Sequence, residues 1–222
     1  MPALDLVNAA RLVNLIGALI LLTAFAMLVT RQVFGAVNAY ALQSVFLAAI
    51  GVVVGYATHL PDLYLVALIT LVSKAIIITY FVRRIARQTE AWRELSLYLN
   101  IPASLLGGCI LVVVAYFVTF AIPVEGSLAT KPSLAIAVAV MLIGLFVMVT
   151  RAELVMQIVG LLTLENGLFF GALAISYGTP LIVEFGIFFD ILVAVLVLLV
   201  LVTRIRAKMG STSTTDLTRL RG

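Results

Sequence analysis

The sequence predicts an all-α membrane protein, a polytopic helical bundle of about seven transmembrane helices. Of its 222 residues, 64% are hydrophobic and only 11% are charged, whereas soluble domains are about half apolar and about one quarter charged. The mean hydropathy is +1.25. The apolar residues form separate runs of about 20 residues, the length of a helix that crosses a hydrocarbon core about 30 Å thick. A β-barrel would instead show short alternating segments.

The first half of the chain holds three predicted spans, over residues 12–30, 36–57 and 62–82. Arg31 to Gly35 separates the first two, and a loop around Pro61 precedes the third, since charged residues, glycine and proline interrupt apolar helices. A charged stretch over residues 83–94 ends the third span. The first span lacks the basic start and small-residue cleavage pattern of a signal peptide, so we expect it to remain in the mature protein.

Four further spans are predicted over residues 99–122, 133–150, 154–176 and 181–203. The breaks between them contain prolines at positions 123, 132 and 180 and charged residues at positions 151 and 153. These are residues at which apolar helices commonly begin or end.

The basic residues predict the orientation of the bundle. Eleven of the 14 Lys and Arg residues fall in the loops and tail of one side, whereas Arg11 and Lys131 fall on the other and Lys74 lies within a span. Positive charge is retained on the cytoplasmic side of a membrane. We therefore expect the N-terminus outside and the C-terminus in the cytoplasm.

An internal repeat divides the chain. Thr30-Arg31 closes the first span as Thr150-Arg151 closes the fifth, and Arg84-Ile85 closes the third as Arg204-Ile205 closes the seventh. Repeats of this kind are common in membrane proteins. We expect two parallel three-helix units, residues 1–85 and 131–206, joined by a cytoplasmic connection and a fourth helix over residues 86–130 and followed by a cytoplasmic tail over residues 207–222.

Four ionisable residues lie within the predicted spans: Lys74, Glu165, Glu184 and Asp190. Each charge costs about 2.5 to 3.5 kcal/mol at a helix centre, and such residues commonly mark a path for protons or ions. We predict that these four residues form a proton path.

Each of these residues also has a structural interpretation. Glu184 could reach the headgroup region, and Asp190 could form a structural pair with Lys74. Asn166 and Gln43 are expected to support the path with interhelical hydrogen bonds.

The sequence favours no catalytic residue, metal ligand set, cofactor motif or nucleic-acid surface. It shows no phosphate-binding loop and no haem or flavin signature, and its basic residues do not cluster with exposed aromatic residues. Its single cysteine, Cys109, allows neither an intramolecular disulfide nor a multi-cysteine metal centre, and we interpret it as a packing residue.

The stretch Gly160-Leu161-Leu162-Thr163-Leu164-Glu165-Asn166-Gly167, followed by Pro180 to Glu184 and Phe189-Asp190, resembles the hydrogenase-4 component E family of membrane subunits, of the formate hydrogenlyase type. Each three-helix unit is more distantly similar to the K subunit of complex I and the C subunit of Mrp-type antiporters. In the complex I pattern the acid directly follows a Gly-Leu pair. Here Leu162 fills that position, and Glu165 follows one helical turn later.

The resemblance implies a non-catalytic subunit of a respiratory complex in a prokaryotic inner membrane. Its expected partners are antiporter-like membrane subunits and a hydrogenase or iron–sulfur and quinone module, surrounded by the lipid bilayer. Glu165 and Glu184 match the acidic positions that the family contributes to a mid-membrane polar axis. The alternative is a subunit of a multi-subunit cation/proton antiporter without a redox module.

Overall fold

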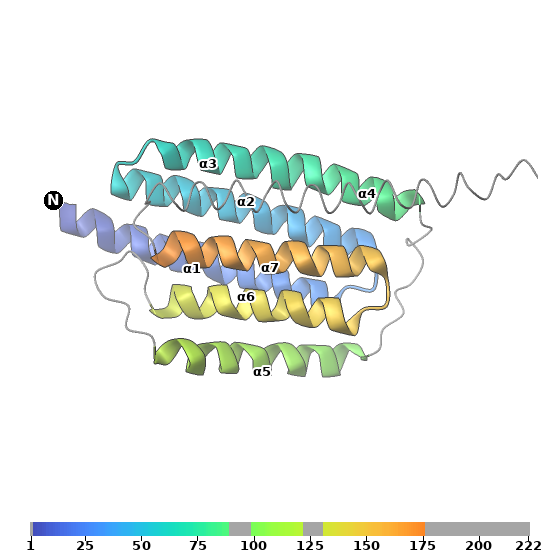
Figure 1. The fold of residues 1–222 in the computed structure, drawn as a ribbon. Coiled ribbons are helices and arrows are strands. Elements are labelled where there is room, and N and C mark those ends of the chain that lie inside the picture. Colours follow the sequence, from blue (N-terminus) through green and yellow to red (C-terminus); the bar gives the residue numbers. More distant parts are fainter. Residues whose placement is uncertain (1, 89–98, 122–130, 176–222) are drawn as a thin grey trace, which may run out of the picture.

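The computed structural model describes residues 2–88, 99–121 and 131–175. Every regular element in these residues is a helix, and six helical stretches are long and apolar enough to cross a membrane. The helices lie side by side in one bundle (Figure 1). The predicted all-α membrane bundle is thereby confirmed, while the predicted seventh span lies outside the described residues.

The first half of the bundle consists of three crossings. The first two are α1 (Pro2–Val29) and α2 (Val33–Thr58). The third is continuous but changes its helical type, from α3 (Asp62–Thr70) through the π-helix η1 (Leu71–Ile78) to α4 (Thr79–Gln88). His59 makes the turn between α2 and α3 in a left-handed conformation with φ of 57°.

The predicted break at residue 83 is wrong, because the third crossing remains helical as far as Gln88. The reason is that α4 is amphipathic. Val82 and Ile85 are buried, whereas Arg83 and Arg84 are exposed. The helix can therefore continue beyond the apolar core of a membrane with its charged face in water.

The remaining crossings are α5 (Ile101–Phe120), α6 (Lys131–Thr150) and α7 (Leu154–Ile175). The side chain of Asn100 caps α5 by accepting a hydrogen bond from the Ala103 N–H at 3.0 Å. Helix α5 lies at the edge of the described bundle against α6 and α1 (Figure 1). Cys109 is exposed on α5, so its interpretation as a packing residue is wrong.

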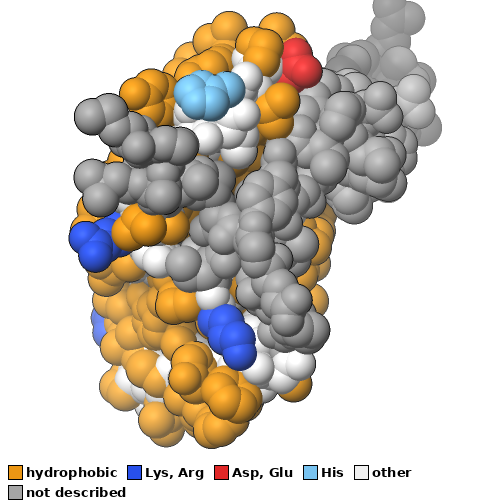
Figure 2. Space-filling view, turned by 90° about the vertical axis from the view of Figure 1, so that its left-hand side faces the viewer, with side chains coloured by type: hydrophobic (Ala, Val, Ile, Leu, Met, Phe, Trp, Pro, Cys, Tyr) orange, Lys and Arg blue, Asp and Glu red, His pale blue; other side chains and the backbone are white. Residues whose placement is uncertain are grey.

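Helices α2 and α7 lie together in the bundle and position the buried polar residues described below. Helix α2 contacts α1, α3, η1 and α7, and α7 contacts α6, α2 and α4. Figure 2 views the end at which α1, α3 and α6 begin, where the described side chains are largely hydrophobic with isolated charged groups. The exposed arginines 31, 83, 84 and 87 lie at the ends of α1 and α4, toward the opposite end of the bundle.

Candidate functional site

Lys74 lies at the middle of the third crossing, within the π-helical segment η1. The Thr79 side chain donates a hydrogen bond to the Lys74 carbonyl at 2.9 Å, and the Thr79 backbone N–H also reaches that carbonyl. A π-helical turn inserts an extra residue into the helix and is frequent at functional sites. The π-helical segment therefore coincides with the position of the buried charge.

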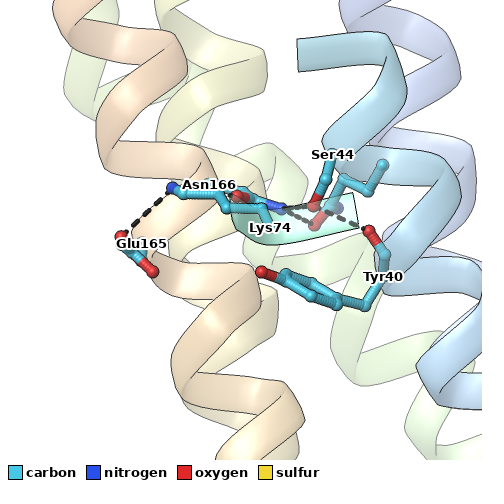
Figure 3. A network of polar contacts seen from close by, with 6 residues as sticks. Tyr40, Ser44, Lys74, Glu165 and Asn166 are labelled. Carbon is cyan, nitrogen blue, oxygen red and sulfur yellow. Dashed lines mark hydrogen bonds and ion pairs between the residues drawn. The ribbon is translucent and has the colours of Figure 1, made fainter. Parts of the chain in front are cut away.

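Lys74 forms an ion pair with Glu165 of α7. Its Nζ lies 3.1 Å from Oε1 of Glu165, and the two side chains are only 1% and 4% exposed. Figure 3 shows the two side chains pointing toward each other, with a dashed line marking the ion pair. The two residues are 91 positions apart in the chain, so only the tertiary fold brings these charges together.

Asn166 connects the ion pair to α2. Its Oδ1 accepts a hydrogen bond from Lys74 Nζ at 3.3 Å. Its Nδ2 donates to Gln43 Oε1 at 3.0 Å and to Ser44 Oγ at 3.3 Å. Gln43 Nε2 in turn donates to the Ile20 carbonyl of α1 at 3.3 Å. The polar contacts thus run from α7 through α2 to α1.

We refer to these five side chains as the polar cluster, which comprises Gln43, Ser44, Lys74, Glu165 and Asn166. All five are buried. Their helices cross the bundle with the cluster near mid-span. Because a buried polar group is costly unless it is satisfied, mutual contacts explain how these residues can occupy a membrane-spanning bundle.

Two aromatic residues border the polar cluster. The Phe169 ring lies one turn after Glu165 on α7, with its centroid 5.2 Å from Lys74 Nζ. Tyr40 is buried on α2, and its ring points toward α7 (Figure 3). Our sequence analysis missed Tyr40, although its helical spacing from Gln43 and Ser44 places the three side chains on one face of α2.

A second buried charge lies away from the polar cluster, at Arg151 between α6 and α7. Its side chain is 1% exposed, and its Nη2 donates to the Leu28 carbonyl at the end of α1 at 2.7 Å. Burial lowers the pKa of Arg151 from its ordinary value, and the nearby carboxylate of Glu153 acts in the opposite direction. The repeat pairs it with Arg31, which is exposed, so only the fold distinguishes the two arginines.

The comparisons with known proteins cover nearly the whole chain. The chain is 32% identical over 215 residues to an uncharacterized protein of Mycobacterium tuberculosis, in an alignment that covers 96% of this chain and 98% of that protein. It is 27% identical over 221 residues to the hydrogenase-4 component E of Escherichia coli K12, which covers 97% of this chain and 100% of that protein. The chain belongs to the hydrogenase-4 component E family. No protein-family model and no solved structure matches it.

Hydrogenase-4 component E of Shigella flexneri matches the chain to the same extent, with 27% identity over 221 residues. The alignment to the family spans both the part of α2 that carries Gln43 and the part of α7 that carries Glu165. The family resemblance expected from the last third of the chain is therefore confirmed, and it extends to the first half.

The fold brings together four of the six residues predicted for the proton path and its support: Lys74, Glu165, Asn166 and Gln43. Glu184 and Asp190 lie outside the described residues, and so does the suggested pairing of Lys74 with Asp190. In the described part of the chain, no group of three or more His, Cys, Asp or Glu side chains is placed to hold a metal ion.

Proposed function

We propose that the chain is a non-catalytic integral membrane subunit of a hydrogenase-4-like or complex I-related respiratory complex, and that its Lys74–Glu165 pair takes part in proton translocation. The observation that carries this proposal is the ion pair itself, buried near the middle of two membrane-crossing helices. Ionisable residues at such a depth commonly belong to proton relays.

Stability alone is a weak reason for a buried ion pair. Replacing such a pair with well-packed apolar residues is often neutral or stabilising, whereas removing one partner is strongly destabilising. Most residues of the third crossing and of α7 are apolar, so a leucine could be buried at position 74 or at position 165. The presence of both charges therefore favours a role in chemistry.

The geometry suits proton transfer between the two side chains. Nζ and Oε1 are 3.1 Å apart, within the range over which a positioned group can exchange a proton. Moving one proton from Nζ to Oε1 converts ammonium and carboxylate into amine and carboxylic acid, so the net charge of the pair is unchanged. A change in the electric field or in the hydration around the pair can then shift the proton between the two residues.

Membership of a larger complex is inferred from the relatives. The curated relatives from Escherichia coli and Shigella flexneri carry the name of a hydrogenase component. We infer that this chain also assembles with a hydrogenase or iron–sulfur and quinone module and with antiporter-like membrane subunits in a prokaryotic inner membrane. The redox chemistry would belong to those partners.

The proposal predicts the behaviour of Glu165→Gln. Glutamine keeps the size of the side chain and can still accept a hydrogen bond from Lys74, but it cannot exchange a proton as a carboxylate does. We expect the complex to assemble and its proton translocation, measured in membrane vesicles by a pH-sensitive dye, to fall by more than half. Asp62→Asn, which neutralises an exposed acid at the start of α3, is the matched control and should leave translocation unchanged.

Assembly is checked in the same preparations by mass spectrometry of the chains that co-purify with the tagged subunit in mild detergent. Antiporter-like chains together with iron–sulfur subunits would support the respiratory complex, whereas antiporter-like chains alone would favour the cation/proton antiporter. Normal translocation by an assembled Glu165→Gln complex would remove Glu165 from the proton path.

A further inference from the structure

The charged end of Lys74 is surrounded on one side by groups that attract any small cation. Its Nζ lies 3.1 Å from the Glu165 carboxylate oxygen Oε1 and 3.3 Å from the Asn166 amide oxygen. The face of the Phe169 ring is 5.2 Å away. An anionic oxygen, a neutral oxygen and an aromatic face therefore converge on one point, and all three come from α7.

We propose that these three groups form a monovalent-cation site that the Lys74 ammonium fills as a tethered occupant, which makes the site selective for protons over Na⁺. A lysine ammonium is a compact charge on a flexible stem. Carboxylate and carbonyl oxygens are ligands for Na⁺ in membrane transporters, and aromatic faces attract cations when they are desolvated. The inference rests on the proposed function, because it names the ion that the same site handles.

The tether explains the selectivity. Lys74 belongs to the same chain as the α7 groups, so its ammonium competes with free Na⁺ at a high effective concentration. For Na⁺ to enter, the ammonium would have to leave its oxygen partners and remain buried beside a second positive charge. A proton can leave the site from Nζ without moving the side chain.

The test removes the tethered cation and asks whether Na⁺ replaces it. Lys74→Ala opens space beside the α7 groups, whereas Lys74→Met fills the same space with an apolar side chain and serves as the matched control. The full chain is purified in mild detergent, and its melting temperature is measured at pH 8 in NaCl and in choline chloride of equal ionic strength. The alkaline buffer lowers the concentration of protons against which Na⁺ competes.

We expect NaCl to raise the melting temperature of Lys74→Ala by about 2 to 4 °C at about five times the Na⁺ dissociation constant, and to raise it further with the logarithm of the Na⁺ concentration. Lys74→Met and the double variant Lys74→Ala/Glu165→Gln should melt at the same temperature in both salts. A Lys74→Ala protein that folds and shows no difference between the salts would overturn the proposal.

The unaltered protein provides a second measurement that does not depend on whether Lys74→Ala folds. Its melting temperature should be the same in NaCl and in choline chloride, since the ammonium already occupies the site. A higher melting temperature in NaCl than in choline chloride that Glu165→Gln abolishes would show that the tethered ammonium does not exclude Na⁺ and would overturn the inference. These are binding measurements, so their failure is distinct from a failure of Glu165→Gln to reduce translocation.

Discussion

At the scale of single residues, Asn166 determines how the polar cluster is connected. Its Oδ1 accepts from Lys74, so its Nδ2 is left to donate to Gln43 Oε1 and Ser44 Oγ. Gln43 must then use its own Nε2 as a donor, which it directs to the Ile20 carbonyl. All these hydrogen bonds point in one direction, away from Lys74 toward α1. We refer to Asn166 and Gln43 as the amide arm. Their side-chain amides do not ionise, so the amide arm positions Lys74, and proton exchange is confined to the ion pair.

This positioning role predicts an energetic coupling between α2 and α7. In a double-mutant cycle, Gln43→Leu and Asn166→Leu remove the two ends of the 3.0 Å hydrogen bond separately and together. We expect a coupling of about 0.6 to 1.7 kcal/mol in the free energy of unfolding, the range found for interhelical hydrogen bonds in membranes.

The measurement is unfolding of the full chain in mild detergent. Asn166→Leu combined with Ser104→Ala is the control cycle, because Ser104 is buried on α5, a helix that lies apart from the polar cluster. That pair should be additive within about 0.5 kcal/mol. Additivity of Gln43→Leu and Asn166→Leu would show that the amide arm does not hold the cluster together.

At the scale of helices, the position of Glu165 depends on the close approach of α6 and α7. A Cβ atom added at Gly144 would lie 2.5 Å from the Leu164 backbone nitrogen and 2.7 Å from the Gly160 carbonyl oxygen. Contacts this short leave no room for a side chain. Gly144 therefore lets the two backbones touch directly beside Glu165.

The contact predicts that Gly144→Ala separates the helices and shifts Glu165 relative to Lys74. We expect a loss of stability of about 1 to 3 kcal/mol from overpacking and reduced proton translocation by the assembled complex. Gly171→Ala is the control on the same helix pair, because its added Cβ would approach the Ala137 Cβ only to 3.5 Å. If both variants behave like the unaltered protein, the backbone contact does not position the site.

At the scale of helices, the positions of the crossings and of the buried charges could be predicted from the sequence. Hydropathy located all six described crossings because burial in lipid requires long apolar runs, and depth in those runs identified Lys74 and Glu165. It did not locate every end, since α1 begins at Pro2 and not at residue 12, and α4 continues to Gln88. The choice of Glu165 as the partner of Lys74 could not be predicted, since it depends on which helix faces η1. The π-helical segment could not be predicted either, because its residues are as apolar as those of an ordinary span.

At the scale of the whole molecule, the two predicted repeat units meet at the polar cluster. Ser133 at the start of α6 contacts Asn14 of α1 at 2.5 Å, and Arg151 after α6 reaches Leu28 near the end of α1. Helices α1 and α6 therefore run in the same direction (Figure 1). Asn166 also donates to Ser44, and the two residues lie on the second helix of their respective predicted units. The division into two three-helix units stays a prediction, because the third helix of the second unit lies outside the described residues.

The orientation of the bundle yields a prediction for the whole molecule. The exposed arginines at the ends of α1 and α4 favour a cytoplasmic location for that end, so the turn before α3 should lie outside the cell. Asp62 and Gln32 are exposed near opposite ends of the bundle, and each can be replaced by cysteine after Cys109→Ala removes the native thiol. In intact spheroplasts, a membrane-impermeant maleimide should label Asp62→Cys and should label Gln32→Cys only after lysis.

The reverse pattern would invert the orientation, and with it the side from which protons reach Lys74 and Glu165. Labelling of both positions before lysis would show only that the membranes were leaky, so a cytoplasmic enzyme with an accessible cysteine is monitored in the same sample and must remain unlabelled until lysis.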